Sequence, residues 1–170
     1  MKKSIIAAAV FGLFATAASA QTPQPADWIT LTFMADLNKN IDVAWERVGG
    51  NDLCAIAKYL DIKGCEPVSG KGELGSVRNI IVATSPAPIV ENIVSRSKYS
   101  YTYAQPFTPI FYHGTMSIVA TGPNTSRLEY TLIWNQAAVG DAAAQAAARD
   151  GRRTRFQAAV DKMAAAANAP

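Results

Sequence analysis

Apolar and polar residues alternate in short stretches through most of the chain, and this pattern predicts β-strands. In residues 28–34, Ile29, Leu31 and Phe33 alternate with polar positions, so that one face of a strand is apolar. Similar short apolar stretches, separated by turn residues, follow from residue 65 onward. They cover residues 65–68, 76–83, 89–96, 99–105, 112–121 and 127–135. Short strands joined by turns favour an antiparallel sheet, here of seven strands.

Other segments repeat their apolar residues with the spacing of a helix. Residues 40–48 predict a short amphipathic helix that ends at Gly49, and residues 52–59 predict a second one. The Ala-rich residues 137–167 have high helix propensity and predict a long C-terminal helix. Its apolar stripe consists of Phe156, Ala159, Val160, Met163 and Ala167. For the part before Gly151, a frayed or partly disordered tail is the alternative.

The first 20 residues have the pattern of a secretory signal peptide. Lys2 and Lys3 precede a short apolar run, and Ala18-Ser19-Ala20 forms a small-x-small cleavage site. The run is shorter than the roughly 20 apolar residues that a membrane-spanning helix needs. We therefore expect cleavage after Ala20, a leader over residues 21–27 and a periplasmic or secreted location. A retained membrane anchor is the alternative, and no later segment is expected to span a membrane.

The net charge argues against a nucleic-acid-binding function. The chain has 16 Lys and Arg against 13 Asp and Glu, and two of its basic residues, Lys2 and Lys3, lie in the expected signal peptide. The exported part would therefore be nearly neutral. Its dense basic cluster, residues 149–155, is interpreted as the solvated side of a helix. The length left after cleavage suits one domain, which we place at residues 28–168.

The two cysteines, Cys54 and Cys65, are expected to form a disulfide, because thiols of exported chains are normally oxidised. Closing so short a loop should stabilise the fold by roughly 3 kcal/mol. A metal site would need more Cys or His ligands, and a redox pair is usually Cys-x-x-Cys. We therefore expect no metal and no cofactor.

Strand parity assigns side chains to the inner face of the sheet, because every second residue of a strand points to the same side. Seven strands curved around one long helix leave an interior that the helix only partly fills. His113 has the opposite parity from Tyr112 and is expected to face outward, which weakens a catalytic interpretation. The inward positions are mostly aromatic and apolar, as suits a flat or apolar ligand. The expected ligand-binding residues are Arg78, Ile80, Val82, Pro86, Pro88, Glu91, Ile93, Tyr101, Tyr103, Tyr112, Met116, Tyr130, Trp134, Phe156, Val160 and Met163.

Two features of the chain together resemble a known superfamily. One is the order of the predicted elements, and the other is the stretch Gly72-x-x-Gly75-Ser76-Val77-Arg78 with Glu91 downstream. Helical Val43-Ala44-Trp45 and Tyr112 after a loop support the resemblance. The chain is identified as a member of the START/pollen-allergen superfamily (SRPBCC), in its polyketide cyclase/dehydrase branch, and is similar to the plant abscisic-acid receptors over residues 33–167.

The resemblance implies an α+β helix-grip fold, in which a seven-stranded antiparallel sheet curves around a long C-terminal helix and encloses a pocket for a hydrophobic or amphipathic small molecule. In the receptors, the loops that match residues 84–88 and 105–111 act as gate and latch. Both loops differ in this chain. Hormone-triggered phosphatase binding is therefore not expected here, whereas ligand binding is.

Several side chains allow two interpretations. Arg78 and Glu91 are either ligand anchors or a buried ion pair, since an unpaired buried charge is costly. The inward tyrosines are either hydrogen-bond donors to a ligand or core residues with a polar tip. Trp45 and Trp134 are interpreted as packing residues.

Three functions follow as hypotheses. The first is an exported binding protein for a hydrophobic small molecule. The second is an enzyme of cyclase or dehydratase type, in which Arg78 or a tyrosine polarises a carbonyl and Glu91 moves a proton. The third is an accessory protein of a periplasmic dehydrogenase, because some exported members of the superfamily accompany such enzymes.

Overall fold

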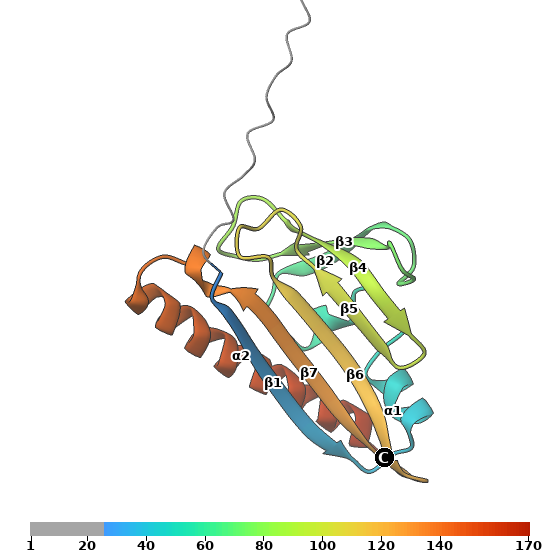
Figure 1. Ribbon diagram of the computed structural model, residues 1–170. Coiled ribbons are helices and arrows are strands. Elements are labelled where there is room, and N and C mark those ends of the chain that lie inside the picture. Colours follow the sequence, from blue (N-terminus) through green and yellow to red (C-terminus); the bar gives the residue numbers. More distant parts are fainter. Residues whose placement is uncertain (1–25) are drawn as a thin grey trace, which may run out of the picture.

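The computed structural model describes residues 26–170, so the predicted signal peptide and most of the predicted leader lie outside the described residues. Seven strands form one antiparallel sheet in the order β1-β7-β6-β5-β4-β3-β2 (Figure 1). This is the predicted seven-stranded sheet, with strand ends shifted by a few residues. The strands are β1 (Trp28–Leu37), β2 (Gly64–Ser69), β3 (Val77–Ile81), β4 (Ile89–Ser97), β5 (Ser100–Ala104), β6 (His113–Gly122) and β7 (Thr125–Asn135).

The long C-terminal helix α2 (Ala142–Asn168) lies along one face of the sheet, behind β1 and β7 in Figure 1. The Asp141 side chain caps its first turn by accepting a hydrogen bond of 2.9 Å from the Ala144 amide. The helix runs unbroken through Gly151, so the predicted helix is confirmed on both sides of this glycine. Residues before Asp141 form only a short 3-10 turn, η2 (Gln136–Ala138), because Gly140 has a φ of 121° that a helix does not allow.

The predicted helix over residues 40–48 is confirmed as α1 (Ile41–Arg47), whereas the α-helix predicted over residues 52–59 is wrong. Its place is taken by a single 3-10 turn, η1 (Ala55–Lys58). The Asp52 side chain accepts a hydrogen bond of 2.9 Å from the Cys54 amide and so holds a local turn. The Cys54–Cys65 disulfide then ties this segment to β2, as predicted.

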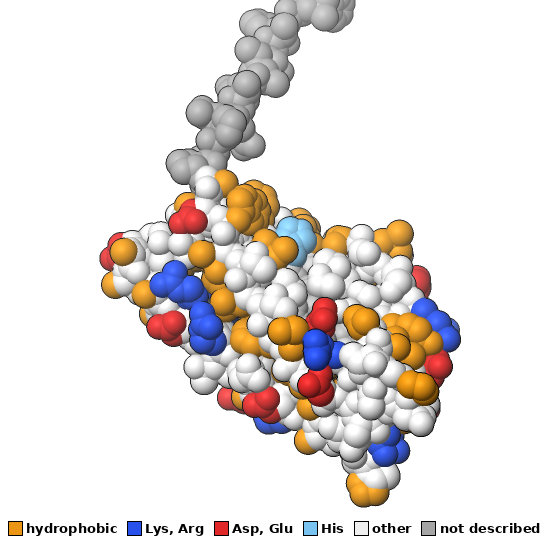
Figure 2. Space-filling view, turned by 60° about the horizontal axis from the view of Figure 1, so that its bottom comes forward, with side chains coloured by type: hydrophobic (Ala, Val, Ile, Leu, Met, Phe, Trp, Pro, Cys, Tyr) orange, Lys and Arg blue, Asp and Glu red, His pale blue; other side chains and the backbone are white. Residues whose placement is uncertain are grey.

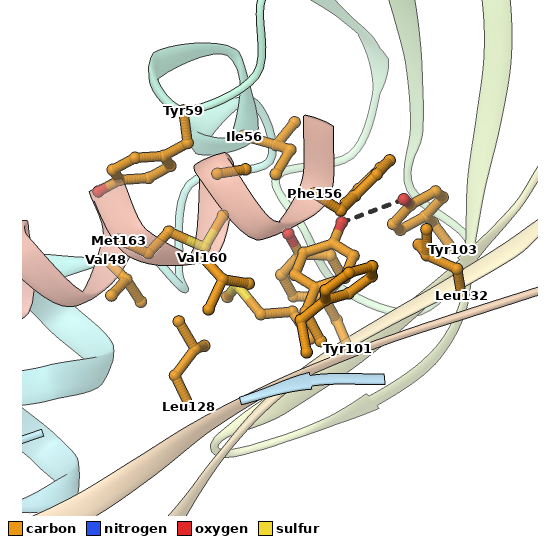
Figure 3. Close-up of a cluster of buried hydrophobic side chains, with 14 of the residues drawn as sticks. Val48, Ile56, Tyr59, Tyr101, Tyr103, Leu128, Leu132, Phe156, Val160 and Met163 are labelled. Carbon is orange, nitrogen blue, oxygen red and sulfur yellow. Dashed lines mark hydrogen bonds between the residues drawn. The ribbon is translucent and has the colours of Figure 1, made fainter. Parts of the chain in front are cut away.

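The core lies between the sheet and the apolar stripe of α2. Figure 3 shows Phe156, Val160 and Met163 of α2 pointing toward side chains of the sheet, among them Leu128 and Leu132. The predicted helix stripe is buried throughout. Trp45 and Trp134, which were interpreted as packing residues, are buried as well.

The turns between strands gather at the two ends of the sheet. In Figure 1, the β3–β4 and β5–β6 loops lie together at the end where β1 begins.

Candidate functional site

An internal cavity of about 140 Å³ lies between the inner face of the sheet, α2 and the segment around η1. It adjoins an open groove of about 870 Å³, because Val82, Ile89 and Arg155 line both. The walls of the cavity are mostly aliphatic and aromatic, and its charged and amide groups come from β3, β4, the start of the β5–β6 loop and α2. The lining residues are Ile56, Leu60, Ile62, Arg78, Ile80, Val82, Ile89, Glu91, Tyr103, Gln105, Tyr112, Arg152, Arg155 and Phe156.

Arg78 and Glu91 lie directly opposite each other on β3 and β4 and form a buried ion pair. Arg78 Nε donates a hydrogen bond of 2.9 Å to Glu91 Oε2, and Nη2 lies 2.8 Å from the same oxygen. Nη1 donates to the carbonyl oxygen of Leu53. Gln105 Nε2 donates to Glu91 Oε1 at 2.9 Å. Each side chain therefore holds the other, so the ion pair that the sequence offered as one of two interpretations is present in the structure.

Both charges of this pair are almost wholly removed from water, with 1% of Arg78 and 4% of Glu91 exposed. Burial is the largest single effect on Arg78 and opposes its positive charge, but the attraction of Glu91 together with that of the neighbouring tyrosines outweighs burial and raises the Arg78 pKa above its ordinary value. Burial also raises the pKa of Glu91, and Arg78 and Gln105 oppose this rise. The pair thus fixes a polar point in an otherwise apolar interior.

Tyrosine rings surround the ion pair. The Arg78 guanidinium lies 4.9 Å from the ring centre of Tyr103 and 5.8 Å from that of Tyr101, both within cation–π range. Tyr130 donates a hydrogen bond of 3.0 Å to the Tyr103 hydroxyl, drawn as the dashed line in Figure 3. Burial raises the pKa of all these phenols and of Tyr112. They stay protonated at neutral pH and can act as neutral hydrogen-bonding groups.

The structure brings only part of the expected ligand-binding set to the cavity. The cavity is lined by Arg78, Ile80, Val82, Glu91, Tyr103, Tyr112 and Phe156. Other expected residues are buried in the core without lining it, namely Ile93, Tyr101, Met116, Tyr130, Trp134, Val160 and Met163. The reason is that side chains of α2 fill the middle of the sheet, where the Phe156 and Tyr130 ring centres lie 5.3 Å apart.

The expected loop residues Pro86 and Pro88 are exposed, and neither is among the residues that line the cavity or the adjoining groove. The inward parity of the strands is confirmed. His113 is half-buried on the other face, where its Nδ1 lies 2.7 Å from the Phe111 carbonyl oxygen. Figure 2 shows this histidine at the surface beside hydrophobic side chains.

Some lining residues were missed by the sequence reasoning. Gln105 lies two residues beyond Tyr103, so strand parity could have included it. Ile56, Leu60 and Ile62 also line the cavity, because of a tertiary arrangement that the local sequence pattern does not predict.

Arg152 and Arg155 belong to the basic cluster interpreted as a solvated helix side. The exposed Arg153 and Arg155 agree with that interpretation. Arg152 contradicts it, because this half-buried side chain lies over the rings of Tyr112 and Trp134.

Residues 26–170 contain no group of three or more side chains suited to hold a metal ion. Among the helices of this described part, none is both long and apolar enough to cross a membrane.

The fold has clear counterparts among solved structures, although no protein-family model and no curated protein matches the sequence. Norcoclaurine synthase from Thalictrum flavum is 12% identical, with a TM-score of 0.64 over 84% of this chain and 94% of that one. The Zhui aromatase/cyclase from Streptomyces sp. R1128 is 12% identical, with a TM-score of 0.66 over 83% and 94%. XoxI from Bacillus cereus is 17% identical, with a TM-score of 0.63 over 81% and 94%. The chain therefore has the helix-grip fold of the START/SRPBCC type, and at these identities the likeness concerns the fold alone.

Proposed function

We propose that this chain is an exported protein that binds a hydrophobic or amphipathic small molecule in the cavity between the sheet and α2. The observation that carries the proposal is an unfilled interior with mostly apolar walls that adjoins an open groove. Ligand pockets commonly measure about 300–1,000 Å³, more than the about 140 Å³ of the cavity. A ligand therefore occupies the cavity with one end and extends into the groove.

The polar groups of the cavity differ in whether they already form hydrogen bonds within the protein. Arg78 and Glu91 are committed to each other, to Leu53 and to Gln105. Their part is to keep that end of the cavity polar and rigid. The aliphatic side chains of Ile80, Val82 and Ile89 then supply the apolar contact area.

Binding is tested with the neutral fluorescent probe N-phenyl-1-naphthylamine. We expect saturable binding by the purified protein. Val82→Trp should weaken it by about tenfold or more, because an indole at a residue lining both cavity and groove fills the space that the probe needs. Val119→Trp is the matched control, since Val119 is exposed on β6 and lines neither. Absence of saturable binding, or equal binding by both variants, would overturn the proposal.

A cyclase or dehydratase activity is the second candidate. Glu91 lines the cavity, and burial raises its pKa, as a proton-transferring carboxyl requires. Glu91→Gln keeps an acceptor oxygen for Arg78 but removes the titrating group. Turnover of a polyketide-type substrate should then be abolished while the circular dichroism spectrum stays unchanged; retained turnover would exclude Glu91 as the proton carrier.

A further inference from the structure

The mouth of the cavity carries two arginines on one side of α2. Arg152 and Arg155 are three residues apart, so their side chains lie on the same helix face, next to Phe156. Both line the cavity, and Arg155 also lines the groove. A molecule that extends from the groove into the cavity therefore lies beside Arg155, and Arg152 lines the cavity that it enters.

Arg152 is held in place by aromatic rings rather than by a carboxylate. Its guanidinium carbon lies 4.7 Å from the Trp134 ring centre and 5.6 Å from that of Tyr112. Nη1 donates a hydrogen bond of 3.1 Å to the Ala148 carbonyl oxygen within the helix. Stacking orients the planar group while the donors on Nε and Nη2 stay without a protein acceptor among residues 26–170.

Arg155 has neither a hydrogen bond nor an ion pair with any residue that the structure describes. Asp61 and Asp150 line the groove, but neither forms an ion pair within the described chain. Glu91, the acid inside the cavity, has both oxygens engaged by Arg78 and Gln105. Among residues 26–170, neither arginine of the cavity mouth therefore forms an ion pair with a carboxylate.

Two neighbouring guanidinium groups repel each other, and burial lowers the pKa of Arg152. A ligand that carries a negative charge relieves this repulsion and accepts charge-assisted hydrogen bonds from both guanidinium groups. The walls beyond the arginines are aliphatic or aromatic, and they suit the apolar part of the same molecule.

Resting on the proposed function, we infer that the ligand is an amphipathic carboxylate, with its carboxylate between Arg152 and Arg155 at the mouth and its apolar body against Ile80, Val82 and Phe156. The substrate class is therefore an organic acid with a flat or aliphatic body, rather than a neutral lipid or an amine.

The test compares two probes of similar shape, the anionic 8-anilinonaphthalene-1-sulfonate and the neutral N-phenyl-1-naphthylamine. The sulfonate stands in for the ligand carboxylate. We expect Arg155→Gln and Arg152→Gln each to weaken binding of the anionic probe by about tenfold, and binding of the neutral probe by less than about twofold. Arg153→Gln is the matched control, because Arg153 is exposed on the same helix and lines neither space.

The outcomes separate the two proposals. In one outcome, Val82→Trp loses binding of both probes, whereas Arg153→Gln and Arg155→Gln bind them equally well. This outcome would overturn the carboxylate site and leave the ligand-binding function standing. Absence of binding by either probe would overturn both. Arg155→Gln alone suffices for the comparison if Arg152→Gln does not fold, because the Arg155 side chain is exposed and makes no described hydrogen bond.

Competition with a saturated fatty acid and with the fatty alcohol of the same chain length distinguishes a carboxylate ligand from a merely apolar one. The acid should displace the anionic probe at a concentration about tenfold lower than the alcohol, and Arg155→Gln should remove most of this difference. Equal displacement by acid and alcohol would contradict the inference.

Discussion

The ion pair between Arg78 and Glu91 is the most demanding contact of the interior at the scale of single residues. Glu91→Ala would leave the Arg78 charge buried and without its counterion, which costs about 3–5 kcal/mol of unfolding free energy. Urea denaturation measures this loss. Asp36→Ala, which breaks the exposed pair with Arg127, is the control and should cost less than about 1 kcal/mol. Equal costs for the two variants would show that the buried pair is not what holds this region.

Glu91 should also make the free energy of unfolding depend on pH. Burial raises its pKa above the ordinary value of 4.5. At a pH between the ordinary pKa of the unfolded chain and the raised pKa of the native protein, native Glu91 holds a proton that the unfolded chain has already released. The pH-dependent part of the contribution of Glu91 to stability is therefore complete below about pH 4.5 and is lost as the pH rises through the raised pKa.

The measurement is the difference in unfolding free energy between the natural protein and Glu91→Gln at a series of pH values. This difference should fall as the pH rises from about 4.5 and become constant above the raised pKa. A difference that grows with pH would mean a lowered pKa instead.

Strand parity identified which residues face the interior, since the period of two is a property of the backbone alone. It could not say which inward residues meet empty space. Tyr101 and Tyr103 are both buried on β5, yet only Tyr103 lines the cavity, because this depends on how the other elements pack against the sheet.

At the scale of elements, two glycines have opposite structural roles. Gly114 on β6 lies opposite Tyr103, and a Cβ there would come within 2.3 Å of the Tyr103 ring. Gly114→Ala should therefore destabilise the protein by about 1–3 kcal/mol. Gly151 lies in the middle of α2 with open space around it, so Gly151→Ala should stabilise by about 0.5–1 kcal/mol.

Thermal or urea unfolding of both variants measures these opposite signs. Destabilisation by Gly151→Ala would contradict an uninterrupted α2 at this point. A neutral Gly114→Ala would mean that the Tyr103 ring has room to move and that this wall of the cavity is soft.

Elements with a strong local pattern were predictable from the sequence, and α2 with its buried stripe is an example. The segment around η1 was not. Its apolar spacing fits a helix, but the Asp52 turn and the disulfide at Cys54 impose another path. This path carries Leu53 to Arg78 and Ile56 to the cavity, so the site depends on it.

At the scale of the whole molecule, the proposed function depends on a space between the sheet and α2 that the chain itself does not fill. The resemblance to the START/SRPBCC superfamily predicted such a space, and the fold agrees with that expectation. The cavity is smaller than common ligand pockets, because α2 side chains occupy the centre of the sheet. The arginines at its mouth come together only in the folded chain.

The most direct test of ligand binding is a crystal structure of the protein grown with N-phenyl-1-naphthylamine. The account predicts the probe between Ile80, Tyr103 and Phe156, with its outer ring reaching the groove beside Arg155. A probe found only on the outer face of the sheet, with the cavity collapsed or filled by protein side chains, would contradict it.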